Sequence, residues 1–330
     1  MRRFVLHRLL SLFPVMLGVT FVTFFLISLT PGDYMSTLSL SPDVSRERIE
    51  KLRRDFGLDE PWYIQYFHWL YRLSPIEFPA GLKRPDLGYS FSNKTPVLDL
   101  IGTRFCNTLV LSCSAELFIW IIAIPLGTLA AVRRNHWPDR LFSFGVYMGI
   151  SMPEILLALL ALLIAAKTGW FPTGGMQTID SGHLSLWPKT LDLLHHLALP
   201  TLVLGIGGTA SLMRYMRGSL IETLSSDYVR TARAKGLDER AVVVRHAFRN
   251  AINPVLTLFG FSLANLISSS FLVEIILGWP GLGKLTYDAI LSRDQYLLMA
   301  SLLMATAFLI IGNLIADLLL AATDPRVRYD

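Results

Sequence analysis

The chain has 330 residues, of which 52% are apolar and only 17% are charged, and its mean hydropathy is +0.47. This balance excludes an ordinary pair of soluble domains and indicates that lipid is the main solvent. The formal net charge is +5. In so apolar a chain we assign the excess to basic loops on the cytoplasmic side of a membrane, and we expect no nucleic-acid partner.

Six apolar stretches are long enough, or nearly long enough, to cross the hydrocarbon core, which takes about 20 residues. They run over 9–29, 108–132, 141–166, 197–213, 254–277 and 296–320. The fourth is the weakest, because it is short and contains Gly205, Gly207 and Gly208. We retain it because membrane helices tolerate glycine, and because its loss would move the basic segment 214–253 to the other face. The sequence predicts an all-α, polytopic membrane protein with six transmembrane helices.

Basic residues are distributed unequally between the loops. With the N-terminus inside, the short cytoplasmic segments hold 16 Lys and Arg residues, and the two short outside loops hold four. The positive-inside rule therefore places both termini in the cytoplasm. The expected organisation is a tail and first helix (1–30), a long periplasmic loop (31–105) and a five-helix core (106–330) with the cytoplasmic loop 214–253.

The long outside loop has structure of its own. Ile49, Leu52 and Phe56 fall on one face of a helix, and charged residues surround them. Gly57 follows in the position of a C-cap glycine. We expect a short amphipathic helix over 45–56.

Acidic residues occur within or beside the predicted spans, namely Glu116, Glu154, Glu274 and Asp317. Burying a carboxylate in lipid is costly, so each is expected to face protein or water. Glu116 and Glu274 are candidates for a polar translocation path, or else for hydrogen bonds between helices. A structural hydrogen bond is the preferred interpretation for Glu154 and Asp317, which lie near span ends.

The residues that could bind a metal lack suitable spacing. Cys106 and Cys113 would lie two turns apart on a helix, too far for an unstrained disulfide. His195 and His196 are adjacent and would diverge by about 100° on a helix. We expect no metal and no cofactor.

One segment nearly matches a phosphate-binding loop. Residues 278–285 read GWPGLGKL, but Leu285 stands where that loop needs Ser or Thr to hold magnesium. The apolar run before it is also too long for a buried strand. We interpret the segment as a Gly/Pro turn at the end of a membrane helix, and we expect no intrinsic enzyme activity.

The basic inside loop is predicted to form a helical hairpin. Ser225 or Ser226 can cap a helix, and Asp227 lies favourably at its positive end. That helix ends at Gly236, and a second helix is expected over 239–250.

Small residues on this hairpin suit a contact with another surface. Ala232 and Gly236 lie four residues apart on one helical face, which permits close approach. Arg and Lys residues would form the rim of such a contact. The hairpin therefore suits docking of a cytoplasmic partner; the alternative is a solvated basic loop held by anionic membrane lipid.

The two halves of this loop, DYVRTARAKG (227–236) and RHAFRNAINP (245–254), resemble the cytoplasmic loop of peptide/nickel-type (dipeptide/oligopeptide) ABC transporter permeases. Further matching pieces lie along the whole chain in the expected order, namely Pro31–Asp33, Gly57–Pro61 with Gln65–Tyr66, Pro125–Gly127, Pro172–Gly175, Trp279–Gly283 and Asp324–Arg328. The pattern is similar to the first of the two permeases in such systems, which are the inner-membrane components of binding-protein-dependent importers.

This resemblance implies a type I ABC importer permease fold in the bacterial cytoplasmic (inner) membrane. The implied partners are a second permease subunit, two ATP-binding subunits that hydrolyse the ATP, and an extracytoplasmic substrate-binding protein. The implied substrate is a peptide or a similar small solute. An exporter of the same architecture, and an ion-coupled secondary carrier that uses the intramembrane acids, are the alternatives.

The resemblance also implies roles for particular residues. The 227–236 helix would be the coupling helix in a groove of the ATPase. The candidate coupling residues are Asp227, Tyr228, Arg230, Thr231, Ala232, Lys235, Gly236, Arg245 and His246. Arg230 stands where the wider permease consensus has Glu. The first outside loop would help to dock the binding protein, with Asp33, Gly57 and Gln65 as candidates, and Pro85–Gly88 replaces the usual Gly-Asp-Leu-Gly there.

Overall fold

A computed structural model describes residues 2–39, 44–77, 81–82, 84–183 and 185–323. The chain forms two compact units. The core unit comprises Met1–Val5, Thr108–Pro280 and Leu309–Asp330, and the loop unit comprises Leu6–Asn107 and Gly281–Phe308. The division predicted from the sequence, at residues 30 and 105, stays a prediction.

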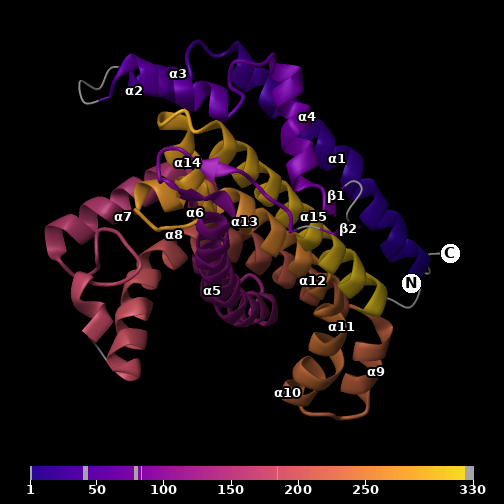
Figure 1. Ribbon diagram of the computed structural model, residues 1–330. Helices are drawn as coiled ribbons and strands as arrows, with labels where there is room; N and C mark the ends of the chain where they lie inside the picture. The colour runs from indigo at the N-terminus through magenta and orange to yellow at the C-terminus, as the bar shows by residue number, and fades with distance from the viewer. Residues whose placement is uncertain (1, 40–43, 78–80, 83, 184, 324–330) are drawn as a thin grey trace. The chain divides into compact units, whose positions relative to one another are not determined.

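Helices make up nearly all of the regular structure, as predicted (Figure 1). The helices are α1 (Arg2–Leu29), α2 (Tyr34–Leu38), α3 (Arg46–Asp55), α4 (Trp62–Leu73), α5 (Val97–Val132), α6 (Trp137–Ser151), α7 (Glu154–Thr168), the 3₁₀-helix η1 (Ile179–His183), α8 (Leu186–Leu224), α9 (Asp227–Ala234), α10 (Glu239–Ala241), the π-helix η2 (Val242–Phe248), α11 (Arg249–Ala251), α12 (Asn253–Leu256), α13 (Leu258–Ile276), α14 (Leu282–Leu291) and α15 (Gln295–Thr323). Two short antiparallel pairs join β1 (Ile76–Glu77) to β2 (Gly81–Leu82) and β3 (Tyr89–Ser90) to β4 (Thr95–Pro96).

Within the described residues, four segments are long and apolar enough to cross a membrane: Phe13–Ser36, Val97–Val132, Leu186–Leu224 and Gln295–Ile315. Two bent pairs also qualify, and they bring the number to six if each pair is one span. These are Trp137–Ser151 with Glu154–Thr168, bent by 100°, and Asn253–Leu263 with Asn265–Ile276, bent by 46°.

The third predicted span, 141–166, is broken rather than continuous. Met152 has extended backbone angles (φ −86°, ψ 124°) and separates α6 from α7. Proline restricts the residue before it to such angles and lacks an N–H for the helix, so Pro153 accounts for the break. The predicted span over 141–166 is therefore present as a bent pair of helices, α6 and α7.

The weak fourth span belongs to α8, a continuous helix of 39 residues. Its glycines allow close packing, because a Cβ on Gly205 would meet the Phe118 ring and one on Gly208 would meet Ile119. Short residues at such positions let membrane helices approach closely. The stretch looks weak by hydropathy because much of it faces protein rather than lipid.

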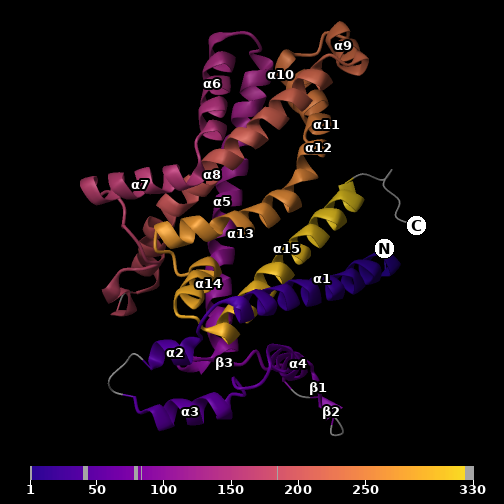
Figure 2. The same cartoon turned by 90° about the horizontal axis from the view of Figure 1, so that it is seen from above.

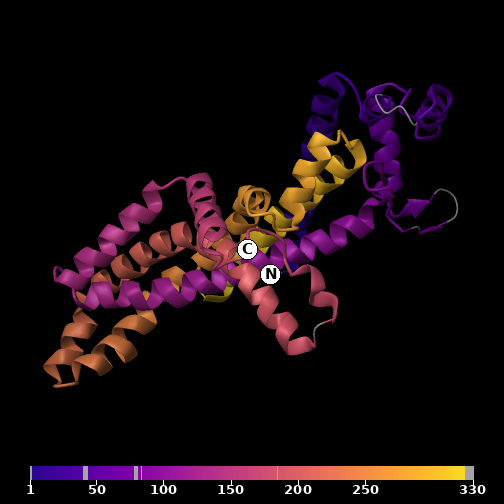
Figure 3. The same ribbon diagram turned by 90° about the vertical axis from the view of Figure 1, so that its left-hand side faces the viewer.

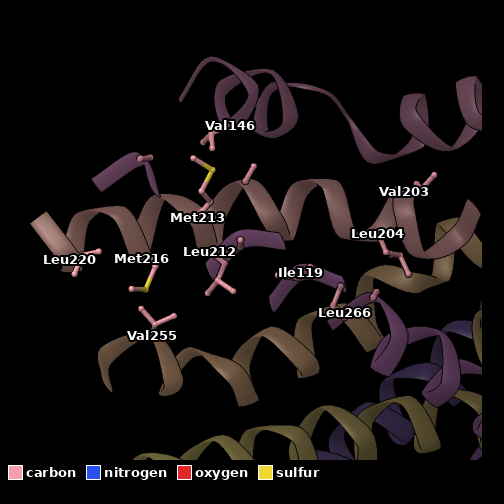
Figure 4. Packing of buried hydrophobic residues seen from close by; sticks show 14 of the residues in the cluster. Ile119, Val146, Val203, Leu204, Leu212, Met213, Met216, Leu220, Val255 and Leu266 are labelled. Atoms are coloured by element: carbon pink, nitrogen blue, oxygen red, sulfur yellow. The ribbon is translucent and has the colours of Figure 1, made fainter. Parts of the chain in front are cut away.

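The core of this unit lies along α8. Met213, Met216 and Leu220 are almost completely buried. Figure 4 shows Met216 facing Val255 of α12, whereas Ile119 of α5 lies further along α8, near Leu266. These buried side chains are apolar, so they fill the spaces between the helices without needing hydrogen-bond partners.

The predicted hairpin forms at one end of α8, where α9, α10 and α11 lie together (Figure 2). The second helix occurs where it was expected over 239–250, but its central segment, η2, is wound as a π-helix. Ser226 occupies the N-cap position of α9 without capping it, because its hydroxyl donates to the Thr223 carbonyl at 2.6 Å. The expected side-chain cap by a serine is therefore absent.

In the loop unit, α1 lies beside the segment 281–308 (Figure 3). Tyr66 of α4 bonds Thr20 of α1 through their hydroxyls at 3.1 Å, and Phe24 packs edge-on against the Tyr66 ring. The predicted amphipathic helix is α3, with Ile49 buried. Gly57 follows it with a positive φ of 67°, as a C-cap glycine should.

Candidate functional site

The hairpin of residues 227–250 has one buried and one exposed side. Val229 and Ala232 point inward and are buried, and α9 packs on η2. The predicted coupling residues that lie exposed on the hairpin are Asp227, Tyr228, Arg230, Thr231, Lys235, Gly236 and Arg245. His246 is half-buried. Ala232 thus supports the helix from inside rather than lying on its exposed face.

Side chains fix the tip of this hairpin. Arg233 donates through Nε and Nη2 to the two carboxylate oxygens of Glu239, at 3.0 and 2.6 Å. This hydrogen bond lowers the pKa of Glu239 and raises the pKa of Arg233. Between them the chain turns at Gly236, whose φ is +75°, and the Asp238 carboxylate caps the next helix by accepting from Arg240 N at 3.1 Å. The tip is therefore ordered without any partner.

Two further hydrogen bonds tie the hairpin together and to α8. The Asn250 amide donates to the Tyr228 hydroxyl at 2.8 Å, which joins the hairpin's two arms. Ser219 of α8 donates to the Ala251 carbonyl at 2.7 Å. Because α8 and the hairpin are bonded at this point, a force on the exposed face would reach α8.

A partly buried ion pair joins α6 to α8 in the same unit. Arg217 donates to both carboxylate oxygens of Asp139, from Nε at 2.6 Å and from Nη2 at 2.9 Å. Asn135 N also donates to Asp139 at 2.9 Å. The sequence does not predict this pair, because neither residue lies in a motif and they are far apart along the chain.

A cavity of about 460 Å³, which we call the bend cavity, lies where α8 and α13 pass the break between α6 and α7. Its polar lining residues are Glu154, Ser211, Tyr215, Ser262, Asn265 and Ser269. Gly207 and Gly208 contribute stretches without side chains. Most of the lining is thus apolar, and the hydroxyl, amide and carboxyl groups form a smaller polar part of it.

Glu116 lies behind one wall of the bend cavity. It is 2% exposed, and its two oxygens accept from Trp120 Nε1 at 2.6 Å and from Ser262 Oγ at 2.7 Å. Since Ser262 lines the cavity, Glu116 contacts the cavity wall but does not line the cavity. Glu116 thus makes a hydrogen bond between helices, which is one alternative, and it also adjoins a cavity with polar groups, which is what a translocation path would need.

Glu274 is fully buried and joins α13 to α5. Its Oε1 accepts from the Thr108 hydroxyl at 2.7 Å and from the Ser270 hydroxyl at 3.2 Å. Glu274 does not line the bend cavity. Its geometry is that of a hydrogen bond between membrane helices.

The candidate docking residues lie in the loop unit. Asp33 pairs with Arg53 at 2.7 Å, and the Gln65 amide donates to the Glu60 carbonyl at 2.7 Å. Asp33 and Gln65 line one cavity of about 540 Å³, whereas Gly57 lies outside its lining. The structure therefore brings together two of the three predicted residues.

A buried carboxylate in this unit was not predicted. Asp294, fully buried, accepts from the Ser90 hydroxyl at 2.7 Å and from the Ser92 hydroxyl and N–H at 2.9 and 3.0 Å. Its signal in the sequence is only the short span of polar residues before α15. The contact fixes the β3–β4 turn onto the start of that helix.

The near-match to a phosphate-binding loop is a turn, as predicted. Gly278 has a φ of +62°, and its carbonyl accepts from Gly175 N at 3.2 Å. A Cβ on Gly174 would lie 3.3 Å from the Leu277 carbonyl oxygen. The two glycines of the Pro172–Gly175 motif thus contact the backbone of this turn closely.

Metal-ligating side chains are scattered in the structure. Over the part of the chain that is described, no group of three or more His, Cys, Asp or Glu side chains could hold a metal ion. Cys106 and Cys113 are both free. His195 bonds the Trp170 carbonyl at 2.8 Å, while His196 bonds the Asp192 carbonyl at 2.9 Å.

Comparison with protein families gives two adjoining matches. Residues 123–329 match the family described as "Binding-protein-dependent transport system inner membrane component". Residues 1–112 match the N-terminal part of the membrane component of such systems. Together the matches cover nearly the whole chain.

Full-length relatives are similar to the chain. It is 37% identical to the oligopeptide transport system permease protein AppB of Bacillus subtilis over 331 residues, covering 100% of both chains. It is 40% identical to a putative peptide permease protein of Brucella ovis, covering 99% of both. It is 36% identical to the glutathione transport system permease protein GsiC of Escherichia coli K12, covering 100% of both.

The fold also has a counterpart among solved structures. A chain of the MetNI methionine ABC transporter, in an inward-facing conformation, aligns with a TM-score of 0.56. The sequences are 17% identical, and the alignment covers 69% of this chain and 97% of the other. This match shows that the two chains share a fold.

Proposed function

The chain belongs to the family of binding-protein-dependent transport system inner membrane components, and from this premise we propose that it imports peptides or a similar small solute. It is the multi-pass permease of such a system, and the ATP is hydrolysed by partner subunits. The observation that carries the substrate proposal is the full-length identity of 36–40% to permeases named for oligopeptides, peptides and glutathione.

In the proposed assembly, this chain pairs with a second permease subunit, and two ATP-binding subunits sit at the cytoplasmic face. A substrate-binding protein delivers the solute from outside. Both chain termini lie in the cytoplasm, as the distribution of basic residues favours. Membrane lipid surrounds the spans.

The hairpin of residues 227–250 is the proposed contact with an ATP-binding subunit. Its exposed residues give that subunit a basic and polar surface, and its internal ion pair and the Asp238 cap support the tip. ATP binding can drive transport only if it favours one pore state over another. A hairpin that is hydrogen-bonded to α8 suits the transfer of that free-energy difference.

The loop unit is the proposed docking region for the binding protein. The segment 31–105 is long, carries 10 basic and 10 acidic residues, and is predicted to lie outside. Asp33, Gly57 and Gln65 are the proposed contributors. A mixed-charge surface suits electrostatic recognition of a soluble partner.

Gly236→Trp tests the coupling role. No heavy atom lies within 4 Å of a Cβ at Gly236, so the indole would project from the hairpin without an internal clash. We expect the purified complex to lose most of its ATP-driven uptake in vesicles supplied with the binding protein. Uptake and ATPase assembly at the wild-type level would contradict the assignment.

Gly169→Trp is the matched control. Gly169 also has a positive φ, 67°, and an open surrounding, so both variants carry the same backbone strain of roughly 1–2 kcal/mol. It ends α7, away from the hairpin, and uptake should be retained. The same vesicles separate the alternatives: a secondary carrier would work without ATP and stop when the proton gradient collapses, and an exporter would move solute in the opposite direction.

A further inference from the structure

The bend cavity has a polarised lining. Among the described residues that line it, Glu154 is the one acidic residue, and none is Lys, Arg or His. Glu154 is the first residue of α7, where the helix dipole favours a negative charge. A carboxylate in a recess without cations produces a negative potential there, and low-dielectric walls strengthen it.

The Glu154 carboxylate is available to a ligand. Across the residues that the structure describes, its side chain has no hydrogen bond and no ion pair. The other intramembrane acids differ, since Glu116 and Glu274 are each bound by two neighbouring side chains. Of these three acids, Glu154 alone both lines the cavity and lacks a protein partner.

Neutral polar groups lie around the same recess. In the described part of the chain, the Ser211 hydroxyl and the Asn265 amide have no hydrogen-bond partner, and both line the cavity. A Cβ added at Gly207 would meet no heavy atom within 4 Å. The cavity therefore offers hydrogen-bonding groups and free space next to the carboxylate.

We propose that the bend cavity is part of the solute pathway, and that Glu154 selects there for solutes with a positively charged amino group, such as the amino terminus of a peptide. The inference rests on the proposed function. It adds that the pathway favours solutes with a cationic end. Glu154 attracts the ammonium group, while Ser211 and Asn265 replace part of its hydration. Anionic ends are repelled from the same recess.

The test measures the local potential with charged thiol reagents on the whole transport complex. Cys106 and Cys113 are replaced by Ser, and Gly207→Cys supplies a thiol in the cavity. The rates of reaction with a trimethylammonium methanethiosulfonate and a sulfonate methanethiosulfonate are compared. We expect the cationic reagent to be favoured, and Glu154→Gln to lower the rate ratio roughly fivefold.

Gly218→Cys is the control on the same helix. Gly218 also has open space for a Cβ. It lies 11 residues after Gly207 on α8, about 16 Å along the helix axis, and this separation exceeds the distance over which salt screens a charge. Its rate ratio should not respond to Glu154→Gln. An unchanged ratio at position 207, or a thiol there that neither reagent reaches because the second permease covers it, would overturn the proposal.

Uptake gives an independent readout. Two peptides, one with a free and one with an acetylated amino terminus, are compared at equal occupancy of the binding protein. Glu154→Gln should lower uptake of the free peptide roughly fivefold and leave the acetylated one unchanged; an equal effect on both would overturn the selectivity. If the wild-type complex imported neither peptide with ATP, the proposed function would fail, whereas the reagent ratios would still report the potential.

Discussion

Arg217 of α8 donates two hydrogen bonds to the carboxylate of Asp139 on α6, at 2.6 and 2.9 Å. The Asp139 side chain is buried, and the Arg217 side chain is about 30% exposed. Bidentate pairs of this kind are geometrically specific. The pair therefore fixes how α6 packs on α8. Helix α6 is the first half of the bent third span, and α8 leads into the hairpin.

Removing one partner leaves the other charge poorly compensated. We expect Asp139→Ala to lower the free energy of unfolding by roughly 2–4 kcal/mol, since broken buried pairs cost about 3–5 kcal/mol and Arg217 keeps some contact with solvent. Thermal unfolding of the purified protein in detergent measures this. Arg230→Ala removes an exposed pair with a separation of 3.6 Å and should leave the midpoint unchanged; equal losses in both variants would be evidence against a special role for Asp139.

Close helix packing at Gly127 is a second stability prediction. A Cβ there would lie 2.8 Å from the Met213 carbonyl oxygen, a backbone atom that cannot rotate away. Gly127→Ala should therefore destabilise the protein by roughly 1–3 kcal/mol, as overpacking does. Gly102→Ala, on the same helix with open space around it, should be neutral or slightly stabilising. Unfolding midpoints of the two variants decide, and similar values would contradict the close contact.

Asp294 should hold the β3–β4 turn in place. Asp294→Ala removes the acceptor of the three hydrogen bonds from Ser90 and Ser92, and we expect the segment 84–96 to become much more sensitive to protease. Limited proteolysis measures the cleavage rate of this segment, in vesicles oriented so that the protease can reach it. Asp288→Ala, at an exposed position of α14, should leave the cleavage rate as in the wild type. A resistant Asp294→Ala variant would show that other contacts hold the turn.

The hairpin tip should respond to acid. The hydrogen bond from Arg233 lowers the pKa of Glu239 in the folded state, so the stability it adds is complete above the ordinary Glu pKa of about 4.3 and is lost as the pH falls below that value. Both side chains are partly exposed, so the effect is small, about 0.2–1 kcal/mol. Hydrogen exchange of residues 233–241, corrected for intrinsic rates, should show reduced protection near pH 3.5.

Glu239→Gln provides the comparison for this prediction. The amide cannot ionise, so the variant should show the weaker protection at neutral pH as well, with little further change on acidification. A wild-type protein whose protection at the tip is the same at pH 7 and pH 3.5 would exclude a contribution from the Arg233–Glu239 pair.

Local patterns predicted the helices and the hairpin well, but they did not predict contacts between distant segments. Gly57 and Gly236 were recognisable because a helix end needs a positive φ that glycine supplies. Pro153 was visible in the third span, yet membrane helices often tolerate proline, so the sequence did not distinguish a kink from a break of 100°. Asp139, Arg217 and Asp294 acquire their partners only through the tertiary fold.

The π-helical segment Val242–Phe248 has an implication for how the hairpin can change over evolution. A π-turn holds one residue more than an α-turn for about the same length of helix axis. Deleting a single codon within this segment could convert it to α-winding while both flanking turns keep their orientation. A variant of this chain that lacks one residue of the segment should therefore keep the hairpin tip in the same orientation.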